Sequence, residues 1–287
     1  MRSLLFSLAA CAAFAVAPAQ AQDQDASPTA ADLPDAGGDF AIVGAGAAIL
    51  PDYEGSNDYS VTPFPAAIGR VSGFAFTVLG NRASVDLIRD GVGPTWDFQA
   101  GPIAVVNFNR SSVDAIDDIR VASLPERDIA IELGGYVGIG KTGVITSDFD
   151  RLSASLSYRT DVSGTHESGI WTPSVSYSTP LSRKALVGLF VSAERVENRY
   201  ADTYFSVTAP DAVLSGLPAY DADGGWKHYT IGLAFTHSLT GDLLNGLQLV
   251  AGGTYKRMLN DFGDSPITSV AGSRGQWLGA VGLAYSF

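Results

Sequence analysis

Histidine is the side chain best suited to act as a general base near neutral pH, and the chain has three: His166, His228 and His237. A lipase or protease would need such a base beside a nucleophile. The sequence contains neither a Gly-x-Ser-x-Gly nucleophile elbow nor a His-Glu-x-x-His metal motif. A catalytic pairing of His228 with Asp221 or Asp223 stays open, but a hydrogen-bonded structural histidine is the simpler interpretation. We therefore predict no catalytic site and no enzymatic activity.

Acidic side chains gather in one stretch, at Asp114, Asp117 and Asp118, and could bind a divalent cation. The spacing lacks the glycine and the glutamate of a calcium-binding loop, so a solvated acidic surface is the favoured interpretation. The whole chain carries 30 acidic and 18 basic residues, which gives a net charge of −12. Nucleic-acid binding would need clustered Lys and Arg. We predict no metal, no cofactor and no nucleic-acid partner.

The elements that would position these residues follow an export signal. Arg2 precedes the apolar run 4–17, and an Ala-Gln-Ala sequence that ends at Ala21 is the small-x-small pattern that signal peptidase cleaves. We predict a cleaved signal peptide at 1–21. A flexible periplasmic tail is predicted at 22–39, because this stretch is rich in Asp, Ala and Pro and has almost nothing apolar to bury.

The single cysteine, Cys11, lies inside the signal segment. Its surroundings, Leu8-Ala9-Ala10-Cys11, also resemble a lipoprotein signal box, although the apolar core before Cys11 would be short for one. Without Cys11, a mature chain can form no disulfide.

From residue 40 onward, apolar and polar side chains alternate in segments of about ten residues, which is typical of membrane β-barrels. In the segment 276–287, one face carries Trp277, Val281 and Tyr285, which would meet lipid. The other face carries Gln276 and Ser286, which would line a lumen. A soluble β-sandwich also alternates, but its outer face rarely stays uncharged for so long. We predict an all-β, antiparallel transmembrane β-barrel of about 12 strands (about 10 to 14) over 40–287, closed by pairing of its first and last strands.

Long polar connections alternate with short ones, as in bacterial barrels, whose short turns face the periplasm. The long connections are predicted at 51–60, 110–127, 162–168, 209–225 and 260–274. This alternation places both ends of the barrel domain in the periplasm. Two places fit less well. Pro63 and Pro65 cannot donate ladder hydrogen bonds, and 73–89 is compatible with one bent strand or with two short ones joined near Gly80.

Seven charged or titratable residues fall on the inner faces of the predicted strands: Asp97, Glu132, Arg151, Arg159, Glu194, His228 and Lys256. His228 is the only histidine that we expect to enter the lumen. Both signs of charge occur in this set, so the side chains could pair with one another inside a filled barrel. They could also line a path for a small solute, since barrels of this size lie between filled ones and wide porins.

Several short segments occur in an order that resembles one family. They are Pro51-Asp52-Tyr53-Glu54-Gly55-Ser56, Pro63-Phe64-Pro65, Ile131-Glu132-Leu133-Gly134, Tyr204-Phe205-Ser206-Val207-Thr208, Ser215-Gly216-Leu217-Pro218-Ala219-Tyr220 and Asp264-Ser265-Pro266-Ile267. Together they resemble the MipA/OmpV family of outer-membrane proteins, from about Phe40 to Phe287. The turn-rich motif residues, which we expect to cover one barrel mouth, are Asp52, Tyr53, Gly55, Ser56, Asp264, Ser265 and Pro266.

The resemblance implies a scaffold. In the best-known member of the family, the barrel joins a lytic murein transglycosylase to a penicillin-binding murein synthase. The family has no established catalytic residues, so none is carried over. The terminal residues Leu283, Tyr285 and Phe287 also resemble the C-terminal signal that the barrel-assembly machinery reads.

We therefore expect a scaffold or interaction protein in the outer membrane of a Gram-negative bacterium, in contact with outer-membrane lipids. Two alternatives stay open. One is a small-solute channel or ligand-binding barrel, and the other is an adhesin that acts through its outer loops.

Overall fold

The computed structural model describes residues 39–89 and 96–287, so the predicted signal peptide and nearly all of the predicted tail lie outside the described residues. Most of the described chain is strand. The strands are β1 (Phe40–Pro51), β2 (Tyr59–Val71), β3 (Phe74–Leu79), β4 (Arg82–Val85), β5 (Trp96–Asn107), β6 (Ala130–Thr142), β7 (Arg151–Asp161), β8 (Gly169–Ser182), β9 (Ala185–Val196), β10 (Gly225–Ser238), β11 (Gly246–Met258) and β12 (Gly275–Ser286). Short helical segments lie between them: η2 (Val113–Ala115), α1 (Ile119–Ala122), α2 (Asn198–Tyr204), α3 (Ala209–Ser215), α4 (Asn260–Asp264) and α5 (Pro266–Ser269).

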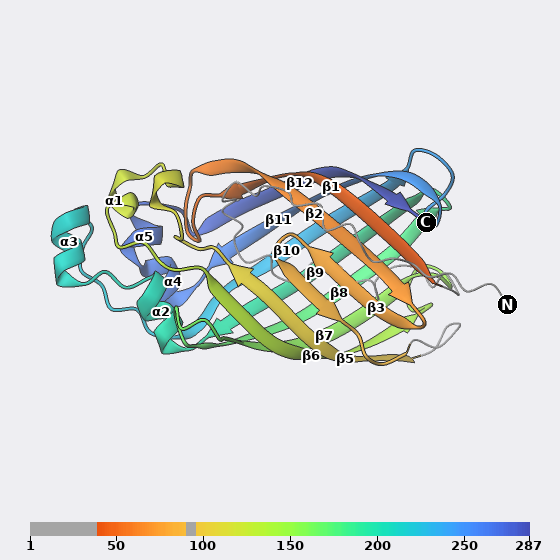
Figure 1. Cartoon of the computed structure of the whole chain (residues 1–287), viewed down its shortest axis with the longest axis horizontal. Helices are drawn as coiled ribbons and strands as arrows, with labels where there is room; N and C mark the ends of the chain where they lie inside the picture. The colour runs from red at the N-terminus through yellow and green to blue at the C-terminus, as the bar shows by residue number, and fades with distance from the viewer. Residues whose placement is uncertain (1–38, 90–95) are drawn as a thin grey trace.

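The sheet closes on itself (Figure 1). Each strand pairs with the next one in antiparallel fashion, and β1 also pairs with β12. This seam runs from Ile42, opposite Ser286, to Ile49, opposite Gly279. Pairing of the first and last strands leaves neither of them with an open edge at the seam. The predicted fold class is therefore confirmed, as a closed barrel of 12 antiparallel strands.

The two faces of the wall differ in polarity. In β12, the outward side chains of Trp277 and Val281 are 68% and 54% exposed, whereas the inward side chains of Gln276 and Ser286 are buried. An apolar outer surface of this kind is what lipid covers in an outer-membrane barrel. Among the residues that the structure describes, no helix is both long and apolar enough to cross a bilayer.

Tryptophans lie near both rims of the apolar wall. Trp171, Trp226 and Trp277 are close to the strand ends that carry the long connections, and Trp96 begins β5 at the opposite end. All four are at least 39% exposed. At Trp96, the ammonium group of Lys141 lies 5.1 Å from the centre of the ring. These positions suit amphipathic rings at the two membrane interfaces.

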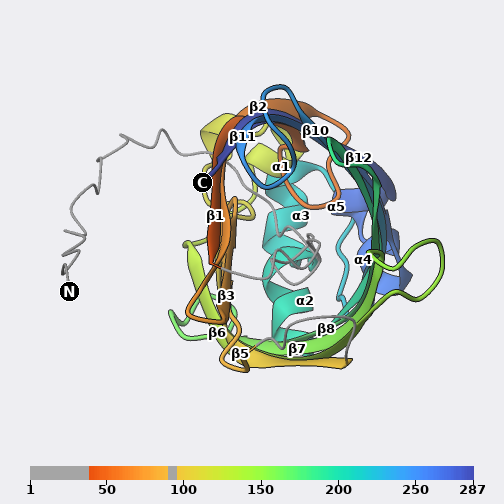
Figure 2. The ribbon, with the colours of Figure 1, turned by 90° about the vertical axis from the view of Figure 1, so that its right-hand side faces the viewer.

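The connections differ in length at the two ends of the barrel. Phe40 and Phe287 lie at one end together with the short turns, and we call this the terminal end (Figure 1). At the opposite loop end, the connections after β5, β9 and β11 contain the helical segments. Seen along the barrel, α1, α2 and α3 lie across the far mouth, within the outline of the wall (Figure 2). Because bacterial barrels keep their short turns in the periplasm, we assign the terminal end to that side.

One section of the wall is short. The segment that the sequence left ambiguous forms two strands, β3 and β4, joined by a turn at Gly80, whose φ is 55°. β3 pairs with β2 only from Ala66 onward, so among the described residues 59–65 of β2 have only β1 as a strand partner. The carbonyl oxygen of Pro65 accepts the N–H of Gly80 and so faces away from β1. Pro63, two residues earlier, faces the same way, so neither proline removes a donor from the β1–β2 ladder.

Candidate functional site

Buried apolar side chains fill the loop end in two clusters. One is built around Tyr200, Tyr204 and Phe262, between α2, α4 and the ends of β8, β9 and β11. The other is built around Tyr53 and Ile267. We call the connections that supply these clusters the loop cap: 52–58, 108–129, 197–224 and 259–274.

Two of the family motifs meet in the loop cap. The Tyr53 hydroxyl donates to the carbonyl oxygen of Ala271 at 2.8 Å, across 218 residues of chain. Burial raises the pKa of Tyr53 well above its usual range, which keeps this hydroxyl protonated as a donor. Gly55 adopts a φ of +104°, and its carbonyl oxygen accepts the N–H of Ser273 at 2.7 Å. A Cβ at Gly55 would lie 2.6 Å from Thr268 Oγ1, so the close packing of these loops needs glycine here.

Asp52 and Ser56 are buried on either side of Tyr53 and Gly55. An Asp52 carboxylate oxygen accepts the N–H of Asp117 at 3.3 Å. Burial raises the pKa of Asp52 above its ordinary value. The Ser56 carbonyl oxygen accepts a hydrogen bond of 2.9 Å from Gln276 Nε2, which ties the first connection to the last strand.

The second motif loop turns at Asp264, Ser265 and Pro266. Ser265 is buried and donates its hydroxyl to the carbonyl oxygen of Phe205 at 2.6 Å. Pro266 is the first residue of α5, where a missing N–H costs nothing. Asp264 forms an ion pair with Arg274 in which both side chains are about half exposed to solvent.

Glu54, in the middle of the first motif, contacts residues of the inner barrel wall. Its Oε2 accepts hydrogen bonds of 3.0 Å from Lys227 Nζ and of 3.0 Å from the Tyr200 hydroxyl. Its Oε1 lies 3.3 Å from His228 Nε2 and 3.6 Å from Lys256 Nζ. Burial alone would raise the pKa of Glu54, but the charges of Lys227 and Lys256 outweigh it and hold this pKa well below its ordinary value. Glu54 is therefore an ionised carboxylate at the base of the loop cap.

The ion pairs continue around the inner wall. Lys227 also pairs with Glu194 of β9, and Glu194 accepts a hydrogen bond of 2.7 Å from Arg159 of β7. Arg159 pairs in turn with Glu132 of β6. The side chains of these residues are at most 1% exposed. We give the name lumen network to seven of the residues in contact here: Glu54, Glu132, Arg159, Glu194, Lys227, His228 and Lys256.

The lumen network is balanced in charge, apart from its histidine. Its three carboxylates face three permanent cations, and each charge has an opposite charge within 4 Å. Burying an unpaired charge costs several kcal/mol, whereas paired and hydrogen-bonded charges are tolerated inside proteins. The network reaches from β6 to β11 and holds the first connection of the loop cap against the wall.

The structure brings five of the seven predicted lumen residues into this network. The other two, Asp97 and Arg151, lie toward the terminal end, where they form an ion pair with each other. Gln99 also donates a hydrogen bond of 2.8 Å to Asp97. In the described part of the inner wall, Asp97 and Arg151 are thus a second group of paired charges, apart from the lumen network.

Sequence reasoning missed Lys227 and Glu54. In a strictly alternating strand, Lys227 would face lipid because its neighbour His228 faces inward, yet both are buried. The register with β9 shifts between Trp226 and His228, and this β-bulge turns two consecutive side chains inward. The available signal was a lysine at a position that would otherwise face lipid, where a charge is costly. Glu54 was hidden because it lies in a connection, outside any alternating segment.

His166 departs from expectation. It lies in the β7–β8 connection, but it is buried, and its Nε2 is 3.2 Å from Glu132 Oε1. The prediction that only His228 enters the lumen is therefore wrong. The physical reason is a local turn, in which the Asp161 carboxylate accepts the N–H groups of His166 and Glu167 at 2.7 and 3.0 Å and curls the connection inward.

The described contacts of His228 are with two carboxylates of the lumen network, one in the β1–β2 connection and one on β9. Its Nε2 lies near carboxylate oxygens of Glu54 and Glu194, at 3.3 and 3.9 Å, rather than near Asp221 or Asp223. The arrangement is that of a histidine inside an ion-pair network. His237 faces outward and stacks beside Phe235, with 6.2 Å between the ring centres.

The acidic stretch in the β5–β6 connection is used for local structure. Asp118 caps α1 by accepting the N–H groups of Arg120 and Val121, and it also pairs with the Arg120 side chain at 2.6 Å. Hydrogen bonds from Arg120 lower the pKa of Asp118. Within 39–89 and 96–287, no group of three or more His, Cys, Asp and Glu side chains is placed to hold a metal ion.

The family assignment rests on the whole barrel. The family described as MltA-interacting protein MipA matches residues 43–287. The chain belongs to the MipA family. The resemblance inferred from the short motifs is thus confirmed, and the match with MipA runs from β1 to the terminal residue, Phe287.

Solved structures similar to this MipA-family chain are outer-membrane proteins. The channel DcaP of Acinetobacter baumannii is 10% identical, with a TM-score of 0.38 over 89% of this chain and 99% of that chain. The CymD monoaromatic hydrocarbon channel is 9% identical, with a TM-score of 0.38 over 87% and 89%. The toluene transporter TodX of Pseudomonas putida is 9% identical, with a TM-score of 0.33 over 86% and 88%. Comparison with curated proteins finds no match. Likeness at this level says nothing about function.

Proposed function

We propose that this MipA-family protein is a non-enzymatic scaffold of the outer membrane that binds a lytic murein transglycosylase and a penicillin-binding murein synthase. The family description names an interaction with MltA, which supports a binding role. The observation that carries the proposal is the lumen network beneath the loop cap, because paired charges and packed connections at this mouth suit a protein that acts through a surface.

The terminal end is the surface that we assign to the partners, since murein lies in the periplasm and short turns face that side. The β6–β7 connection presents three exposed apolar side chains there. Val144, Ile145 and Phe149 are 40%, 66% and 66% exposed, and we call them the turn patch. Apolar and aromatic side chains that a partner can cover are the usual anchors of an interface.

The backbone under the turn patch is held in place by Asp150. Its carboxylate accepts the N–H groups of Val144 and Ile145 at 2.6 and 2.8 Å, and the Tyr177 hydroxyl at 2.8 Å. Burial alone would raise the pKa of Asp150, but hydrogen bonds from backbone N–H groups, first that of Thr146 and then that of Val144, hold it below its ordinary value. A preordered turn loses little conformational entropy on binding, which favours a docking role.

Affinity capture from solubilised membranes tests the proposal. Tagged wild-type protein should retain a transglycosylase and a penicillin-binding synthase under gentle detergent. The double variant Ile145→Ser/Phe149→Ser should retain at least about tenfold less, because it removes two candidate anchors. The matched control is Val213→Ser/Leu214→Ser on α3, where the two side chains are 85% and 67% exposed at the opposite end. Equal capture by the two double variants would reject the turn patch, and no capture by the wild type would reject the scaffold.

A small-solute channel is the competing function, and the same preparation distinguishes the two. Fused into a planar bilayer, a scaffold with a paired lumen network should show no stepwise conductance. Steps that change on Arg159→Ala would reveal conduction past the network and would count against the proposal. Arg159 is suited to this test because it is paired with both Glu132 and Glu194.

A further inference from the structure

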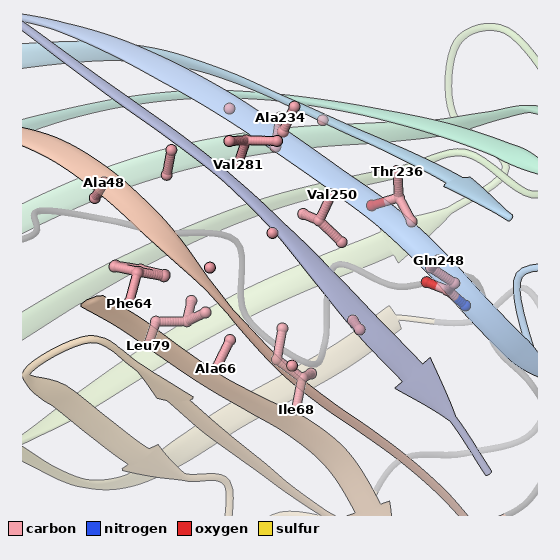
Figure 3. Close-up of a pocket in the computed structure, with 18 of the residues that line it drawn as sticks. Ala48, Phe64, Ala66, Ile68, Leu79, Ala234, Thr236, Gln248, Val250 and Val281 are labelled. Carbon is pink, nitrogen blue, oxygen red and sulfur yellow. The ribbon is translucent and has the colours of Figure 1, made fainter. Parts of the chain in front are cut away.

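The lumen has a cavity with a volume of about 280 Å³. It lies against β1, β2 and β9 to β12, and it extends from the lumen network at Lys256 to Phe40 at the terminal end. Figure 3 shows part of its wall, with Ala48, Phe64 and Leu79 toward one end and Thr236 and Gln248 toward the other.

The cavity exists because the closing seam is built from small residues. A Cβ at Gly44 or Gly46 would lie 2.8 or 2.3 Å from a carbonyl oxygen of β12, so the close approach of β1 and β12 needs glycine at these positions. Ala280 and Gly282 of β12 line the same side. A wall without long side chains leaves the lumen beside it unfilled.

The wall chemistry changes along the cavity. Its middle is lined by apolar groups such as Phe64, Ile68 and Phe190. Polar groups gather at the terminal end, where Gln248 Nε2 donates to Ser286 Oγ at 2.6 Å and Thr236 lies nearby on β10 (Figure 3). At the loop end the cavity is lined by Thr230 and Lys256, and Lys256 is already paired with Glu54. An apolar middle with polar groups at the terminal end is the pattern of a binding site for an amphiphile that enters from that end.

The shape of the cavity restricts the ligand further. Lining residues on β1 run from Phe40 to Leu50, which covers almost the whole strand. At about 3.3 Å per residue and a tilt of about 40°, that is roughly 25 Å along the barrel axis. The cavity is therefore elongated along the barrel axis. A linear chain fits it better than a ring system does.

We propose that this cavity binds an amphiphile with one alkyl chain. The tail lies between β1, β2 and β9 to β12 and points toward the loop cap, and the polar end lies beside Thr236, Gln248 and Ser286. Because the loop cap and the lumen network occupy the other mouth, the ligand enters from the terminal end. This site is separate from the turn patch, so ligand binding and enzyme capture can fail independently.

Two cavity-filling variants and one matched control test the proposal. A Cβ at Gly188 would meet only Ala234 Cβ within 4 Å, at 3.9 Å, so both positions have room for a larger side chain that projects into the cavity. The filling variants are Gly188→Phe and Ala234→Phe. The control is Ala154→Phe, which makes the same substitution as Ala234→Phe but on the exposed lipid face of β7. A folded barrel is verified for each variant by its shift in electrophoretic mobility on heating.

The probe is radiolabelled dodecanoic acid, added to full-length mature protein in lipid nanodiscs, with uptake by empty nanodiscs subtracted. The wild type and Ala154→Phe should bind about one equivalent saturably, and the filling variants should bind at least about tenfold more weakly. On the wild type alone, octanoic acid should bind at least about tenfold more weakly than dodecanoic acid, because each buried methylene adds affinity.

Three results would overturn the proposal. The first is no saturable uptake above empty nanodiscs. The second is equal binding by the filling variants and the control. The third is naphthalene binding with no dodecanoic acid binding, which would show a site for compact rings. The chain-length comparison on the wild type decides the matter even if both filling variants fail to fold.

Discussion

Glu54 lies in the connection between two strands, but its side chain contacts residues of the inner barrel wall. Its carboxylate meets Lys227, Lys256 and His228 while its backbone lies in the β1–β2 connection. A single side chain thus joins the loop cap to β10 and β11. Removing one partner of a buried ion pair is costly because the remaining charge stays buried without compensation.

The first prediction follows from this position. Glu54→Gln should lower the free energy of unfolding by about 3–5 kcal/mol, because Lys227 and Lys256 lose a buried counter-charge. Reversible unfolding in guanidinium with lipid vesicles measures it. Asp264→Asn is the control, since it breaks a half-exposed pair with Arg274 and should cost less than about 1 kcal/mol. Equal losses of unfolding free energy in the two variants would show that the buried ion pairs of Glu54 contribute no more stability than the half-exposed pair of Asp264.

The second prediction concerns pH. The pKa of Glu54 is lowered from an ordinary value of 4.5, so its ionised form stabilises the folded state at pH values above 4.5. This stabilisation should be lost as the pH falls below 4.5 toward the folded-state pKa. Between pH 5 and pH 3, the wild type should therefore lose more unfolding free energy than Glu54→Gln does. Parallel pH profiles would show that other carboxylates account for the loss.

For single residues, alternation was enough to find inward side chains such as those of Arg159 and Glu194. When one side chain of a strand faces inward, the side chains two residues before and after it face inward too. It could not find Lys227, because a bulge breaks the period. It could not find His166, because the course of a connection depends on hydrogen bonds that have no period. Alternation also could not predict contacts such as that between Glu54 and Lys256, because the two residues are far apart in the sequence and come together only when the barrel closes.

The strands depend on a few places where backbones approach closely. At the seam between β1 and β12, a Cβ at Gly46 would lie 2.3 Å from the carbonyl oxygen of Val281. At Gly188 of β9 an added Cβ would meet nothing closer than 3.9 Å. The same chemical change should therefore have different consequences at the two positions.

The third prediction is that Gly46→Ala destabilises the barrel by about 1–3 kcal/mol, because the two seam strands must move apart. Gly188→Ala should change stability by less than about 0.5 kcal/mol. The fraction of folded barrel, followed by electrophoretic mobility during guanidinium titration, measures both. Similar midpoints would show that the seam accommodates a methyl group without strain.

The short helices of the loop cap were outside the reach of sequence patterns. α1 has 4 residues and α2 has 7, which is too few for a helical period to show. Isolated helices of this length are unstable in water, so packing in the cap must hold them. Strands of 11 to 14 residues, by contrast, repeat their alternation often enough to be recognised.

At the scale of the molecule, the alternation predicted a closed barrel, and closure follows because a sheet edge in lipid has no hydrogen-bond partner. The alternation could not predict the function, because the apolar side chains of the outer face indicate only that this face contacts lipid. Short motifs such as Asp264-Ser265-Pro266 led to the family, and their contacts with Phe205 and Arg274 became visible only in the folded chain.

The fourth prediction separates assembly from stability. Phe287 is 68% exposed, and among the described ring contacts it has one, a tilted contact with Tyr285 at 4.8 Å between ring centres. Phe287→Ala should therefore change the unfolding free energy by no more than about 1 kcal/mol, yet it should reduce the amount of barrel in the outer membrane of cells. Quantitative blotting of membrane fractions, beside refolding in vesicles, checks both parts. Normal assembly in cells would show that Phe287 is not part of the recognition signal.

The short β3–β4 hairpin also bears on how neighbouring copies behave in a crowded membrane. Within the described part of the chain, residues 59–64 of β2 have no strand beside them on the side away from β1, and a strand of another barrel could add itself there. Pro63 and Pro65 have no N–H to offer on that side, so they make this stretch a poor template. We expect Pro63→Thr/Pro65→Thr to keep the barrel folded but to form cross-linkable pairs in vesicles. If the variant forms no more cross-linked pairs than the wild type does, the two prolines affect only the conformation of β2.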